Sequence, residues 1–100
     1  MRKYIAFLKV IEHGSFTTAA EDLNYTQSAV SQMIGSLEKE LNTTLFIRSK
    51  HGLQLTYEGT QLAPIIRRLV DTSNQLKETC LSLKGMQSGV VRIATFATFS

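Results

Sequence analysis

Apolar side chains recur every three or four residues in the N-terminal part of the chain, and this spacing predicts a series of helices. In residues 2–13 one apolar stripe is formed by Tyr4, Phe7, Leu8 and Ile11. Gly14 follows, and glycine can end a helix cheaply in the left-handed conformation. His13 is interpreted as a helix-end residue, since a positive charge there suits the helix dipole.

Residues 14–41 predict two short helices joined by a tight turn. Ser15 is placed to cap the first helix by accepting from the amide of Thr18, and Thr26 is placed to cap the second. Small residues in the first helix let the two helices cross closely. The buried face of the second helix is predicted to consist of Val30, Ile34, Leu37 and Leu41. Together these features predict a helix-turn-helix.

The exposed face of this second helix begins with uncharged polar side chains. A solvated face would more often carry Lys and Glu, whereas the front of a DNA-reading helix presents donors and acceptors to base edges and phosphates. Gln27 is long enough to pair with adenine, although glutamine could also simply fill the first turn. The residues predicted to contact DNA are Thr26, Gln27, Ser28, Ser31 and Gln32.

A β-hairpin is predicted directly after this helix. Asn42 suits a left-handed helix end, and residues 43–48 are mostly β-branched or aromatic. Residues 49–52 favour a turn, and residues 53–56 alternate as a returning strand. Lys50 and His51 would lie at its tip, with Arg48 at the strand end. One interpretation is a solvated turn. Beside a recognition helix, however, a basic hairpin can lie along phosphates or enter the minor groove.

A long helix is predicted from Thr56 to near Lys84, with Pro64 expected to bend it without ending it. Its apolar positions alternate spacings of four and three, which is typical of a helix that pairs with another helix. The predicted dimerisation residues are Leu62, Ile66, Leu69, Leu76, Cys80 and Leu83. Alternatively, the early part of this helix packs back on the first helix. Cys80 is interpreted as a packing residue, because redox chemistry needs an exposed, electropositive thiol.

Composition limits the function classes. With 43% apolar residues a single small domain needs neither disulfides nor metal, and a net charge of +3 is too small to identify a nucleic-acid partner by itself. The two histidines and one cysteine show no metal-ligand spacing, and no glycine motif for a cofactor is present, so we expect no metal, no cofactor and no enzyme activity. The sequence predicts neither a signal peptide nor a membrane span, and hence a cytoplasmic protein.

Three runs of sequence, GSFTTAAEDL, TQSAVSQMIGSLEKEL and LFIRSKHGLQLTYEG, resemble the N-terminal winged helix-turn-helix of LysR-type transcriptional regulators over residues 4–59. The resemblance implies binding to double-stranded DNA at a dyad-symmetric operator. It also implies a linker helix that pairs with its mate in a homodimer or higher homo-oligomer. Gln32 stands where the family commonly has Arg, and Asn42 where it usually has Gly. The resemblance implies a small-molecule effector only if a C-terminal domain exists.

We therefore predict a mainly α fold: a winged helix-turn-helix of three helices and a β-hairpin wing in residues 1–58, followed by a dimerisation linker helix in residues 59–84. Residues 85–100 would form a hinge and the first strand of an effector-binding domain that the sequence otherwise lacks; both a fragment and a natural truncation fit this. A helical dimerisation module, or a truncated regulator that acts through heterodimers, is the alternative function. The basic hairpin beside an uncharged polar helix favours DNA binding.

Overall fold

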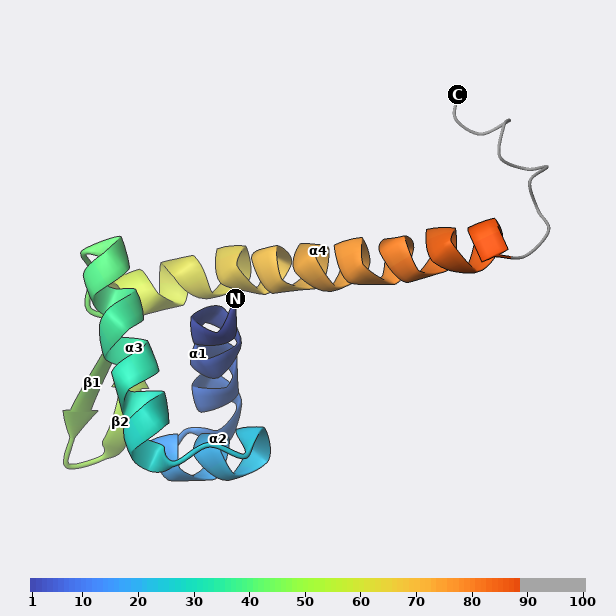
Figure 1. The fold of residues 1–100 in the computed structure, drawn as a ribbon. Helices are drawn as coiled ribbons and strands as arrows, with labels where there is room; N and C mark the ends of the chain where they lie inside the picture. Colours follow the sequence, from blue (N-terminus) through green and yellow to red (C-terminus); the bar gives the residue numbers. More distant parts are fainter. Residues whose placement is uncertain (89–100) are drawn as a thin grey trace. The chain divides into compact units, whose positions relative to one another are not determined.

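A computed structural model describes residues 1–88, which fall into a first unit, Met1–Val70, and a second unit that begins at Asp71. The described elements are α1 (Arg2–His13), α2 (Phe16–Leu23), α3 (Gln27–Leu41), β1 (Phe46–Ser49), β2 (Gly52–Leu55) and α4 (Tyr57–Ser88). Figure 1 shows α2 and α3 following α1, with the hairpin between α3 and α4 in sequence. The predicted fold class, a winged helix-turn-helix followed by a long helix, is confirmed.

The helix ends follow from local chemistry. The Ser15 hydroxyl accepts from the Thr18 amide at 3.1 Å, and the Thr26 hydroxyl accepts from the Ala29 amide at 3.0 Å. Gly14 and Asn42 end α1 and α3 in the left-handed conformation, with φ of 68° and 54°. These caps and ends are the ones that the sequence predicts.

One hydrophobic core holds the first unit together. Phe7 of α1, Leu37 of α3 and Leu45 before the hairpin are its largest fully buried side chains. Ile66 and Val70 of α4, only 4% and 8% exposed, belong to the same core. The assignment of Ile66 to a dimerisation seam is therefore wrong for this structure, because its side chain already packs within its own chain. Early α4 therefore packs on a core shared by α1, α2 and α3, and not on the first helix alone.

The hairpin is a two-stranded antiparallel sheet in which Phe46 lies opposite Leu55 and Arg48 opposite Leu53. The first strand, Phe46–Ser49, is shorter than the predicted 43–48. The second strand, Gly52–Leu55, is shifted by one residue from the predicted 53–56. The reason is that residues 43–45 have other partners. The Thr43 amide donates to the Glu38 carbonyl at 2.9 Å and closes α3, while the Leu45 carbonyl accepts from the Thr56 amide at 2.9 Å.

The structure extends α4 beyond the predicted end near Lys84. Thr56 caps its start by accepting from the Gly59 amide at 2.9 Å, and the helix continues through Pro64 to Ser88. Gly85 and Ser88 of the predicted hinge are therefore helical, because one glycine costs a helix only about 1 kcal/mol relative to alanine and need not end it. Gly89, the third residue of that hinge, lies outside the described residues. The strand predicted for residues 90–96 lies outside the described residues.

Candidate nucleic-acid interface

Core packing on one face of α3 orients the first turns of the helix so that their polar side chains face solvent. Val30, Ile34 and Leu37 are buried on one face of the helix and fix its rotation. On the opposite face all five residues predicted to contact DNA are exposed, namely Thr26, Gln27, Ser28, Ser31 and Gln32. None of them contributes to the core. The Thr26 hydroxyl already accepts from the Ala29 amide as the helix cap, and the other four side chains are available to a ligand.

A side chain of α3 also fixes the position of the hairpin. The Glu38 carboxylate accepts hydrogen bonds from the backbone amides of Leu45, at 2.7 Å, and Phe46, at 3.3 Å. The partly buried carboxylate thus joins α3 to the start of β1. Hydrogen bonds to a charged group are stronger than average. Sequence reasoning did not assign this role to Glu38. A contact between residues so far apart carries no local signal.

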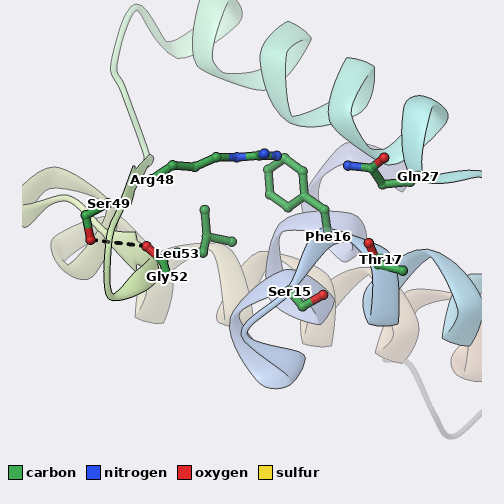
Figure 2. Close-up of a pocket in the computed structure, with 8 residues that line it drawn as sticks. All are labelled: Ser15, Phe16, Thr17, Gln27, Arg48, Ser49, Gly52 and Leu53. Atoms are coloured by element: carbon green, nitrogen blue, oxygen red, sulfur yellow. Dashed lines mark hydrogen bonds between the residues drawn. The ribbon is translucent and has the colours of Figure 1, made fainter.

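Arg48 lies near the end of β1, on the face of the hairpin that meets Phe16. Its guanidinium carbon is 5.0 Å from the centroid of the Phe16 ring, within the range of a cation–π contact. Figure 2 shows the side chain extending across Phe16 toward Gln27. Lys50 and His51, in contrast, form the exposed turn between the strands. The three basic residues predicted for the wing thus divide into one near the strand end and two at the tip.

Two neighbouring hollows separate the hairpin from α3. The first, of about 260 Å³, is lined by Ser15, Phe16, Thr17, Gln27, Arg48, Ser49, Gly52 and Leu53 (Figure 2). The second is lined by Phe16, Ser31, Ile34, Gly35, Glu38, Phe46, Arg48 and Leu53. Arg48 and Phe16 border both. The structure therefore brings Gln27, Ser31 and Arg48 together, while Ser28, Gln32, Lys50 and His51 line neither hollow.

Thr17 and Phe16 are residues of this surface that sequence reasoning did not assign to it. Phe16 is partly buried, and its ring lies against the Arg48 guanidinium. Thr17 is exposed in the first turn of α2 and lines the first hollow. Their position immediately after a helix N-cap is a weak signal, because free amides at such an end favour anions.

A charged cluster joins α1 to α2 away from these hollows. Asp22 lies 2.8 Å from the His13 ring nitrogen and 3.2 Å from the Lys9 ammonium. The hydrogen bond from His13, followed by that from Lys9, lowers the pKa of Asp22, and Asp22 in turn raises the pKa of Lys9. His13 is thus an ion-pair partner as well as a helix-end residue. Glu12, His13 and Asp22 could approach a metal ion, but Lys9 already supplies positive charge there.

The apolar positions of α4 differ in exposure. Leu62 packs against the core of the first unit, while Leu69 in the same unit is 42% exposed. In the second unit, Leu76 and Leu83 are 65% and 53% exposed, and Cys80 is exposed as well. Several large apolar side chains of α4 are thus exposed to solvent, which is typical of a surface that a partner can cover. Within residues 1–88 no helix has the length and apolar character that crossing a membrane requires.

Comparison with known proteins gives one consistent result. The family described as "Bacterial regulatory helix-turn-helix protein, lysR family" matches residues 1–60. The uncharacterized HTH-type transcriptional regulator YvbU of Bacillus subtilis (strain 168) is 40% identical over 95 residues, which cover 94% of this chain and 32% of that protein. The HTH-type transcriptional regulator CzcR of Bacillus anthracis is 37% identical over 100 residues, which cover 100% of this chain and 34% of that protein. The chain thus spans about a third of the length of these relatives.

A solved structure gives the same result for the fold. In the crystal structure of a BenM_DBD/catB site 1 DNA complex, the protein chain aligns with a TM-score of 0.79 at 28% identity. The alignment covers 86% of this chain and 92% of that one. The similarity therefore includes nearly all of a domain that was crystallised with DNA.

Proposed function

The chain belongs to the lysR family of bacterial regulatory helix-turn-helix proteins, and on this premise we propose how its DNA-binding domain contacts DNA. In the proposal, the front of α3 enters the major groove and Gln27 pairs with a base, while Ser28 and Ser31 contact phosphates or a nearby base edge. Gln32 extends the base-facing row. No catalytic step belongs to the proposal.

The observation that carries this proposal is the set of exposed polar side chains on α3 next to a basic hairpin. Gln27 and Ser31 are exposed on a helix whose opposite face is buried, and Arg48 borders the same hollows as both. Arg48 and Lys50 would meet phosphates, because positive charge at a groove edge releases counterions from the duplex. His51 would accompany Lys50 at the tip.

A second part of the proposal concerns assembly. The exposed leucines Leu69, Leu76 and Leu83 follow one another at intervals of seven residues, the repeat of helices that pair with each other. We propose that they form a homodimer or higher homo-oligomer, together with Cys80. A two-fold dimer would place two recognition helices on a dyad-symmetric operator.

Salt-dependent binding tests the DNA contacts. A labelled duplex, selected from a random library by the wild-type chain, is titrated at several salt concentrations with wild type, Arg48→Ala and Lys50→Ala. Each phosphate contact that a substitution removes should reduce the slope of log affinity against log salt by about 0.9. Lys77→Ala, an exposed lysine of α4, is the matched control and should retain the wild-type slope.

Two outcomes would contradict the proposal. A wild-type chain that selects no duplex above random DNA would exclude sequence-specific binding by this domain and favour a protein-interaction module. A wild-type chain that binds, with unchanged slopes in both hairpin variants, would show that the hairpin does not touch phosphates.

A further inference from the structure

We infer that Phe16 is a positioning residue for DNA binding: its ring holds the Arg48 guanidinium beside Gln27 and Ser31, where the arginine can contact the DNA backbone next to the recognition helix. This inference rests on the proposed function. It adds a support for Arg48 to the expectation that this residue, at the strand end, meets DNA beside Lys50 and His51 at the tip of the wing.

The geometry of the strand places Phe16 between two side chains. Phe46 and Arg48 are two residues apart on β1, so both project to the same face of the hairpin. The Phe16 ring meets both: its centroid lies 5.9 Å from that of Phe46, nearly edge-on, and 5.0 Å from the Arg48 guanidinium carbon. One face of the strand is thus shared between an aromatic pair and a cation–π contact.

The support under Arg48 is rigid because it continues into the core. Phe46 packs against Phe7 with ring centroids 5.5 Å apart, and Phe7 is fully buried. Phe16 is the first residue of α2, directly after the Ser15 cap, so its backbone is fixed by the helix start. A row of contacts therefore runs from Phe7 through Phe46 and Phe16 to the guanidinium.

This support leaves the charge of Arg48 available. The ion pairs found within residues 1–88 involve Lys3, Lys9 and His13, and none of them engages Arg48. A long exposed side chain otherwise loses rotamer freedom when it binds a ligand. Because Phe16 already restricts the guanidinium in the free protein, less of that entropy is lost on contact with a phosphate.

A double-mutant cycle tests the coupling. Affinity for the duplex selected by wild type is measured by fluorescence anisotropy for Phe16→Leu, Arg48→Ala and the combined variant. The thermal unfolding midpoint of each is recorded without DNA. Removing the ring should weaken binding about twofold to fivefold when Arg48 is present, the range of an exposed cation–π contact. In the Arg48→Ala background the same change should have almost no effect on affinity. Phe16→Tyr, which keeps an aromatic face, should recover most of the loss.

Equal losses from Phe16→Leu with and without Arg48 would overturn the inference, since the ring would then act only through folding. Wild-type affinity in Phe16→Leu would overturn it as well. If Phe16→Leu does not fold, Arg48→Lys decides. This variant keeps the charge but lacks the planar group that stacks, so a loss of about twofold to fivefold supports the inference and wild-type affinity contradicts it. A wild-type chain that binds no duplex contradicts the proposed function itself.

Discussion

Single exposed residues carry the proposed base reading, and Gln27 provides its sharpest test. Gln27→Ala should leave the free energy of unfolding nearly unchanged, because the side chain is exposed. It should reduce the preference for the selected site over a site with one altered base pair by about tenfold in each half-site, since a bidentate pairing is lost. Competitive binding measures the ratio. A wild-type ratio in the variant would mean that α3 does not read bases through Gln27.

Asp22 provides a pH-dependent test of how α1 is joined to α2. Its pKa lies below the ordinary 3.8 because His13 and Lys9 donate to the carboxylate. A lowered carboxyl pKa stabilises the folded state above the unfolded value, and this stabilisation is lost as the pH falls through the folded value. Asp22→Asn should therefore be less stable than wild type at pH 7, and the difference should shrink below pH 3.8.

Urea unfolding of both proteins at pH 7 and at about pH 2.5, well below the usual aspartate pKa, checks this expectation. Glu21→Gln on the same helix is the control, because among the ion pairs of residues 1–88 none uses Glu21. A difference between Asp22→Asn and wild type that is equal at both pH values would show that charge does not link the two helices.

The start of α4 packs closely against the hairpin at Gly59. A Cβ on Gly59 would lie 2.6 Å from the Leu45 carbonyl oxygen and 2.8 Å from a methyl of Leu55. Gly59→Ala should therefore destabilise the fold by about 1–3 kcal/mol, as overpacking does. Gly35→Ala, inside α3 with open space around the new methyl, should instead stabilise it by about 0.5–1 kcal/mol. Chemical unfolding of both variants gives the signs, and two equal effects would contradict the packing described.

The elements also show which parts of the fold sequence could predict. Caps and helix ends were found because Ser15, Thr26 and Asn42 act within a few residues of their own position. The strand bounds were shifted because residues 43–45 bond to Glu38 and Thr56, which local propensity does not include. The same limit applies to the site. Exposed polar residues of α3 follow from helical spacing, whereas the contact of Arg48 with Phe16 joins distant segments.

Ile66 illustrates a limit of periodicity itself. Heptad spacing predicts that an apolar residue is buried against another surface, but it does not tell whether that surface is a partner helix or the core of the same chain. The structure resolves this for Ile66, which is buried in the first unit, and leaves Leu69 and Leu76 exposed.

The proposed homodimer rests on the exposed leucines of α4. Leu69→Lys combined with Leu76→Lys should convert the proposed dimer to a monomer, because burying apolar surface contributes about 25 cal/mol per Å² and a buried unpaired lysine opposes it. Sedimentation equilibrium at tens of micromolar protein measures the mass. Circular dichroism should show that the helices of the first unit remain. A monomeric wild type, or a variant that stays dimeric, would contradict the proposal.

The separation between the exposed front of α3 and its buried back has a consequence for how such proteins diversify. Substitutions at Gln27, Ser28, Ser31 or Gln32 leave the core untouched, so a lineage can accumulate them without crossing the stability threshold that removes most mutants. If α3 reads bases as proposed, one copy of a duplicated gene can acquire a new target site through a few substitutions that leave stability unchanged. The proposed recognition residues of α3 can therefore change while Val30, Ile34 and Leu37 continue to pack in the core.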